Sequence, residues 1–257
     1  MNQVAAELRK AVTLPATAVA LAIAVIGPIA LAVLNAFNVR DALTTGGRVG
    51  YSTPAEAALS GVPLGAVGAM VLGIVVISSE YTANSTDAGG GRQISTTLIA
   101  SPRRWSLLVA KTAVVVALVV PAAVVSLSVS LPAATIIIGD AAPPDAELSM
   151  GRFVGAGLYW TLAALMALAI TVLARSGIVP LIVLIANGTV VSVSFLLWKV
   201  TPLARYLPDL AGTRLFAGET FTAVDDALPP VTGGIVMAVW TAVLLLVAAV
   251  VLTRRDA

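Results

Sequence analysis

Long apolar runs separated by short polar stretches make up most of this chain. Six charge-free runs are each long enough to cross a hydrocarbon core of about 30 Å, which takes about 20 helical residues. They are 12–34, 57–79, 112–139, 153–174, 176–198 and 231–253. Because backbone groups in lipid need hydrogen-bond partners within their own segment, we expect helices and not strands. The pattern predicts an all-α membrane protein with six transmembrane helices in a single domain, 1–257.

A shorter amphipathic pattern precedes the first run. Val4, Leu8 and Ala11 fall on one face of a helix, and we expect Glu7 and Lys10 elsewhere on its surface. Such a segment is typical of an N-terminal interfacial helix that lies along a membrane leaflet. A frayed tail whose charges stop membrane insertion is the alternative, and the sequence does not choose between the two.

The charges between the runs predict the orientation of the spans. The loops on the side of the termini carry nine basic and four acidic residues, whereas the loops on the other side carry six basic and nine acidic residues. Lysine and arginine accumulate on the cytoplasmic side of membrane proteins. We therefore expect both termini, and the loop around 80–111, in the cytoplasm of a cell whose cytoplasmic (inner) membrane holds this multi-pass protein.

Composition narrows the chemistry that the chain can perform. Hydrophobic residues make up 59% of it and charged residues 11%, and it contains neither cysteine nor histidine. Disulfides, thiolate chemistry, histidine-ligated metals and Ser-His nucleophile pairs are therefore excluded. The net charge of +2 and the absence of a basic run longer than two residues argue against nucleic acid as a partner. We expect no catalytic residue, no metal site and no cofactor in this chain.

The loop 80–111 is the longest polar break in the chain. Within it, Ile94, Thr97, Leu98 and Ser101 share one face of a short predicted helix, which Pro102 ends. This helix fits a groove on another protein, but an ordinary helix on the membrane surface explains the pattern as well. The loop starts at Glu80, for which we expect a basic partner, Arg92 or Arg103.

The same loop resembles the signature cytoplasmic loop of type 2 ABC-transporter permeases, the membrane subunits of bacterial ABC exporters. The resemblance rests on "EY" at 80–81, Gly91, "TL" at 97–98, "PRR" at 102–104 and "AK" at 110–111. "YLPDLAG" at 206–212 is similar to the outer re-entrant segment of that family, and "RRDA" at 254–257 is similar to its usual ending. The segment between Tyr81 and Ile94 is longer than in many members.

The resemblance implies a function for the chain. It would be the permease subunit of an ATP-driven exporter, moving a small or amphipathic substrate out of the cytoplasm or inner leaflet by alternating access. A separate ABC ATPase subunit would bind ATP and magnesium, and a second permease copy or a homologous permease would complete the channel. The loop helix would be the coupling helix, and the implied coupling residues are Glu80, Tyr81, Arg92, Ile94, Thr97, Leu98, Pro102, Arg103 and Arg104.

Few polar residues mark a path through the membrane. The candidates are Asn35, Asn187, Thr189 and Ser192, although a hydrogen bond between helices explains an amide such as Asn187 equally well. Four glycines of the second run (Gly61, Gly65, Gly68 and Gly73) predict close helix packing. We expect no charge inside the spans, which disfavours a proton- or sodium-coupled transporter, and we interpret 199–230 as a lid over the exit.

Two other classes of protein remain open on the sequence. An intramembrane lipid-modifying enzyme would need clustered carboxylates or histidines, and here the acidic residues are scattered. A structural or channel subunit without ATP coupling would need no docking helix.

Overall fold

The computed structural model describes residues 3–47, 53–81, 104–142, 149–182, 193–217 and 227–254. These residues form helices and connecting turns, with no strand among them. The elements are α1 (Gln3–Thr13), α2 (Pro15–Thr45), α3 (Pro54–Leu59), α4 (Val62–Ser78), η1 (Ser79–Tyr81), α6 (Arg104–Ile138), η3 (Gly139–Ala141), α7 (Met150–Ala174), α9 (Val193–Trp198), η4 (Pro202–Tyr206), α10 (Pro208–Thr213) and α11 (Pro230–Arg254).

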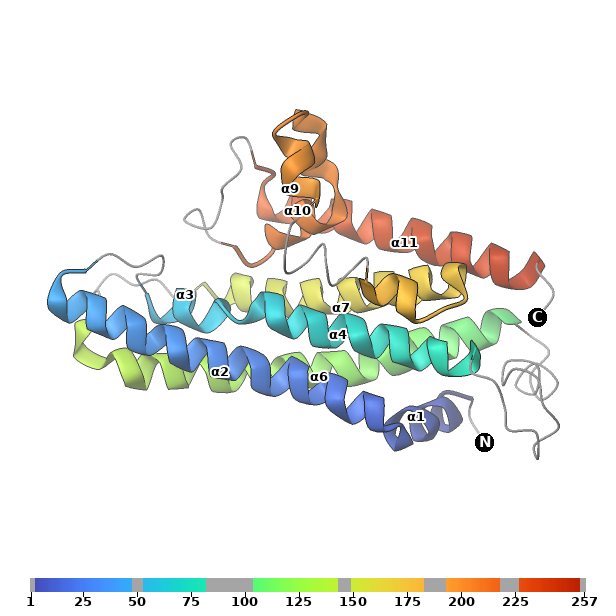
Figure 1. Cartoon of the computed structure of the whole chain (residues 1–257), viewed down its shortest axis with the longest axis horizontal. Coiled ribbons are helices and arrows are strands. Elements are labelled where there is room, and N and C mark those ends of the chain that lie inside the picture. The colour runs from blue at the N-terminus through green and yellow to red at the C-terminus, as the bar shows by residue number, and fades with distance from the viewer. Residues whose placement is uncertain are drawn as a thin grey trace.

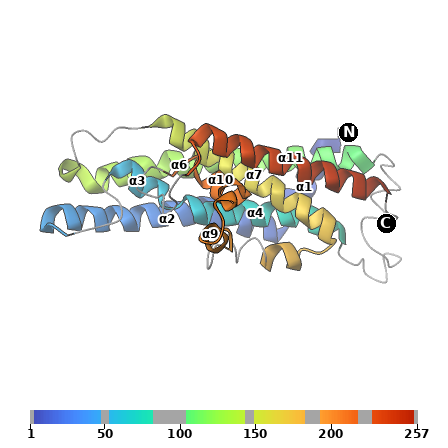
Figure 2. The same cartoon turned by 90° about the horizontal axis from the view of Figure 1, so that it is seen from above.

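Five helical stretches are long and apolar enough to cross a membrane, which makes the chain a multi-pass membrane protein. They run over 15–45, 54–81, 105–141, 150–174 and 230–254. In the bundle, α2 packs on both α4 and α6, α4 packs on α7, and α7 packs on α11 (Figures 1 and 2). Both ends of the chain lie at the same end of this bundle (Figure 1). We call that end the terminal end and the opposite one the far end.

The first predicted span, 12–34, is wrong at both of its limits. The backbone of Leu14 is extended, and Pro15 starts a new helix at the position where proline is favoured, so α1 and α2 are separate helices. Beyond Leu34, α2 continues because small buried side chains follow one another along its inner face as far as Ala42. The helix then ends at Gly46, whose φ of +76° is left-handed.

The second and third predicted spans also differ from the structure. Instead of one helix over 57–79, a short buried helix, α3, starts after Thr53, whose side chain accepts a hydrogen bond from the Glu56 amide at 3.2 Å. Ser60 and Gly61 separate it from α4. The helix predicted over 112–139 instead starts at Arg104 and runs to Ile138, with Pro121 and Pro132 inside it. The limits of α7 and α11 agree with the predicted 153–174 and 231–253 to within three residues.

The fifth predicted span, 176–198, is not one of the five stretches, and its residues 183–192 lie outside the described part of the chain. The described residues on either side of this gap lie at different levels of the bundle. Gly177 packs against Ser78 near the terminal end, whereas the Leu215 carbonyl packs against Gly155 near the far end. Gly177 and Leu215 therefore lie close to opposite ends of α7.

The glycines of α4 permit the close helix packing predicted for them. A Cβ on Gly68 would lie 2.4 Å from the backbone nitrogen of Ala24, and a Cβ on Gly61 would lie 2.5 Å from Pro28. On another face of α4, a Cβ on Gly65 would lie 1.9 Å from the Trp160 ring. The prediction is confirmed at these positions: α4 touches α2 and α7 through backbone that has no side chain.

The segment 202–217 folds back onto the bundle as η4 and α10. Arg152 Nε donates to the Phe216 carbonyl at 2.9 Å, and Trp240 Nε1 donates to the Tyr206 carbonyl at 2.9 Å. Gly212 packs against Tyr159 and Met237. Each of those two residues lies about two turns in from the far end of its helix, α7 and α11 respectively. This segment therefore contacts α7 and α11 about two turns inside their far ends.

Candidate functional site

Helix α1 packs into the bundle with one face, and that face includes a charged residue. Val4, Leu8 and Ala11 share one face as predicted, and this face packs against the core. Glu7 shares the face and is buried, which corrects the expectation that it lies elsewhere. Because α1 is helical from Gln3, the alternative of a frayed tail is wrong. Ala5, Ala6 and Arg9 lie on the exposed side of the helix.

Four charged side chains meet where α1, η1 and α6 come together. Lys111 Nζ lies 2.7 Å from Glu7 Oε2 and 2.9 Å from Glu80 Oε1. Lys10 forms a further ion pair with Glu80 Oε1. We call Glu7, Lys10, Glu80 and Lys111 the charge cluster. It joins three segments that are far apart in sequence, and its formal charge is zero.

Lys111 is the centre of the charge cluster. It lies two turns inside α6, and its side chain is fully buried, as is that of Glu80. Its ammonium group donates to Glu7, to Glu80 and, at 2.9 Å, to the Val76 carbonyl near the end of α4. An ammonium group has three hydrogens to donate, so these three acceptors satisfy Lys111 completely.

Burying these charges is favourable only as a set. Removing two ions from water costs several kcal/mol each, and close, fully hydrogen-bonded pairing is what offsets that cost. Lys10 differs from the others because 26% of its side chain is exposed. Glu56, Glu80 and Lys111 are buried near the ends of two of the five membrane-length stretches, just outside the predicted spans 57–79 and 112–139, so the expectation of spans without internal charge stays a prediction.

The charge cluster lies at the base of the predicted coupling loop. Glu80 and Tyr81 form the end of η1 just before that loop, and α6 starts with Arg104 just after it. The residues predicted to carry the coupling helix (Arg92, Ile94, Thr97, Leu98, Pro102 and Arg103) lie outside the described part of the chain, so the helix itself stays a prediction. The described ion-pair partners of Glu80 are Lys10 and Lys111, and the pairing expected with Arg92 or Arg103 is not tested.

The sequence held a signal for this cluster. Leu107, Leu108, Val114 and Val115 of α6 are buried at helical spacing, and Lys111 falls on the same face. Because an apolar run starts directly after Lys111, this residue also fits the flank of a span, which hides that periodicity. The charge cluster could have been predicted from a charged residue that has the same helical spacing as the buried apolar residues of α6.

One of the four residues predicted to line a substrate path is described. Asn35 Nδ2 donates to Ser60 Oγ at 2.8 Å, between α2 and the junction of α3 and α4. Asn35 therefore acts as a polar contact between helices. Asn187, Thr189 and Ser192 lie outside the described residues.

Comparison with known proteins gives no relative: no family model matches the chain, and neither a curated protein nor a solved structure matches it. Among the described residues, no three carboxylate, histidine or cysteine side chains come close enough to hold a metal ion. Fold and site together define a multi-pass helical membrane protein with a buried charge cluster at its terminal end.

Proposed function

We propose that this chain is the membrane-spanning permease subunit of an ATP-driven ABC exporter. It would move a small or amphipathic substrate out of the cytoplasm by alternating access, with both termini in the cytoplasm of a cell whose inner membrane it spans. A separate ATPase subunit would supply the energy, and a second permease copy or a homologue would complete the pathway.

One observation carries this proposal: the charge cluster joins described residues that precede and follow the segment 82–103. Glu80 precedes the segment by two residues, and Lys111 follows it by eight. Because Lys111 also bonds Glu7, a force applied to the segment would reach α1, α4 and α6 together. This rigid base is what a helix needs if it is to pass the movement of a partner to the bundle.

The far end supports the same proposal. The segment 202–217 packs against Gly155, Tyr159 and Met237, close to the far ends of α7 and α11. It would be the outer re-entrant lid. Non-covalent contacts hold it on the bundle, since the carbonyls of Phe216 and Tyr206 accept hydrogen bonds from Arg152 and Trp240. Opening it would expose the exit of the pathway.

The test is whether an ATPase binds through the predicted coupling helix. The tagged full chain is purified from its native membranes, and the ATPase that co-elutes with it is quantified. Leu98→Asp places a charge on the apolar face of that helix and should release the ATPase. Thr96→Asp, the matched control, changes the opposite face and should retain it.

Two results would contradict the proposal. The first is that no ATPase co-elutes with the wild-type chain in a proportion that approaches one subunit per permease. The second is that Leu98→Asp and Thr96→Asp retain the same amount of ATPase, in which case the helix does not dock as proposed.

A further inference from the structure

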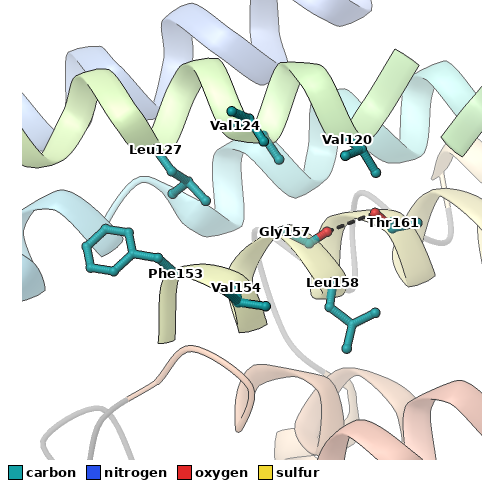
Figure 3. Close-up of a pocket in the computed structure, with 9 residues that line it drawn as sticks. Val120, Val124, Leu127, Phe153, Val154, Gly157, Leu158 and Thr161 are labelled. Atoms are coloured by element: carbon teal, nitrogen blue, oxygen red, sulfur yellow. Dashed lines mark hydrogen bonds between the residues drawn. The ribbon is translucent and has the colours of Figure 1, made fainter. Parts of the chain in front are cut away.

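A groove of about 480 Å³ runs between α6 and α7 and is open along one side (Figure 3). Val120, Val124 and Leu127 line it from α6, and Phe153, Gly157 and Leu158 line it from α7. Its hollow shape comes from small residues that face one another. A Cβ on Gly157 would lie 3.7 Å from the Ala123 Cβ, so neither residue fills the space between the helices.

The lining of the groove offers a ligand only apolar contacts. Its single polar side chain is Thr161, whose Oγ1 donates to the Gly157 carbonyl at 2.9 Å (dashed in Figure 3). The hydroxyl hydrogen is thus already used within α7. A polar ligand would lose its hydration here and find at most one acceptor, the Thr161 oxygen, in return, which is unfavourable. A hydrocarbon chain loses nothing on entering.

Helix geometry gives the depth of the groove in the membrane. Along α6, Val120 and Leu127 are nine and sixteen residues beyond Lys111, or about 14 and 24 Å from the charge cluster at 1.5 Å per residue. Along α7, Thr161 is about 20 Å from Ala174, and Phe153 is about 32 Å from it. If a hydrocarbon core of about 30 Å starts at the level of the charge cluster and Ala174, the groove extends from the middle of the core toward the far end.

We propose that this groove is a binding site for one acyl chain of a phospholipid in the leaflet at the far end. Lipid tails surround the bundle at that depth, and the open side of the groove faces them unless a second permease copy covers it. A tail inside the groove contacts both α6 and α7, whereas a tail on the outer faces of α2 or α11 contacts one helix. This lipid site is independent of the proposed ATP coupling.

Photolabelling of the full chain tests the proposal. The protein is reconstituted in phosphatidylcholine vesicles that contain a phosphatidylcholine with a diazirine at the middle of one acyl chain. After illumination, labelled peptides are mapped by mass spectrometry. Labels should concentrate on 120–127 and 153–161, several-fold above the exposed apolar faces of α2 and α11.

Filling the groove should remove this preference. Gly157→Leu places a side chain in the hollow and should lower labelling of both peptides to the level of α11. Ala242→Leu adds the same bulk at an exposed position of α11 and should leave the groove labelled as in the wild type.

Val124→Phe provides a second variant, because Val124 is exposed at the rim and its replacement leaves the core unchanged. It should reduce labelling in the same direction as Gly157→Leu. Labels spread evenly over all exposed helices would overturn the proposal, since the groove would then hold ordinary surrounding lipid only. Undiminished groove labelling in a folded Gly157→Leu or Val124→Phe protein would overturn it as well.

Discussion

Lys111 is the residue on which the charge cluster depends most. Lys111→Met would leave Glu7 and Glu80 buried around a neutral side chain, and breaking a buried pair in this way costs about 3–5 kcal/mol. The expected result is a protein that unfolds at a clearly lower temperature in detergent or lipid.

Lys10→Met is the matched control, because Lys10 is partly exposed and pairs with Glu80 alone among the described residues. Its effect should be clearly smaller than that of Lys111→Met, because Glu80 keeps Lys111 as a partner and Lys10 is partly in contact with solvent. Equal destabilisation by the two substitutions would contradict the central place of Lys111.

Glycine-to-alanine substitutions at two positions should have opposite effects. At Gly65, the added methyl group would overlap the Trp160 ring and disturb the 2.8 Å hydrogen bond from its Nε1 to the Val62 carbonyl. Overpacking of this kind costs about 1–3 kcal/mol. Thermal unfolding in detergent measures the loss.

Gly157→Ala is the comparison, since the new methyl group would meet only ordinary contacts there. Alanine is favoured over glycine inside a helix by about 0.5–1 kcal/mol, so this variant should be slightly more stable than the wild type. If Gly65→Ala is as stable as Gly157→Ala, the described contact between α4 and α7 is wrong.

Among the elements, α1 is the one whose role changed most between sequence and structure. Cysteine labelling can test its packing, because the natural chain contains no cysteine. Ala6→Cys lies on the exposed side of α1 and should react rapidly with a maleimide, whereas Ala11→Cys is buried and should be protected. Adding Lys111→Met to the Ala11→Cys protein should make that cysteine reactive.

Protection of Ala11→Cys that persists without Lys111 would mean that apolar contacts alone hold α1. Rapid labelling of Ala11→Cys in the otherwise natural chain would mean that α1 does not pack on α6 at all. A helix lying free on a leaflet would give that second result.

The sequence predicted which segments are long helices more accurately than it predicted the first and last residues of those helices. Apolar length identified the helices that became α7 and α11 nearly to the residue, since charged or polar residues flank both closely. It failed at α2 and α6, because a helix continues for as long as one face stays buried, even when its exposed face has become polar. Asn38, Arg40 and Asp41 are exposed on the last turns of α2, next to buried Val39 and Ala42.

Only part of the charge cluster could be predicted from the sequence, for a related reason. The predicted site named Glu80 but assigned it basic neighbours from its own loop. Its described partners come from residues 70 positions before it and 31 positions after it. Contacts at such separations depend on how the helices are arranged, and periodicity within one segment carries no information on that.

At the scale of the whole molecule, the orientation in the membrane is the first prediction. Both termini lie at one end of the bundle, and the excess of basic residues on that side favours the cytoplasm. Single cysteines at Thr45 and Thr222 should react with a membrane-impermeant maleimide added outside intact cells. Cysteines at Gly89 and Ser176 should react only after the membrane is opened, and labelling of Gly89→Cys from outside would contradict this orientation.

The measurement that tests the account most directly is ATP hydrolysis by the permease and its co-purified ATPase in proteoliposomes. If the charge cluster transmits movement between the ATPase and the bundle, Lys111→Met should change the hydrolysis rate per bound ATPase several-fold, and Lys10→Met should change it less. Quantifying bound ATPase in the same vesicles separates this effect from loss of binding. An unchanged rate in Lys111→Met, with the ATPase fully bound, would contradict the account, and so would a wild-type complex that hydrolyses no ATP.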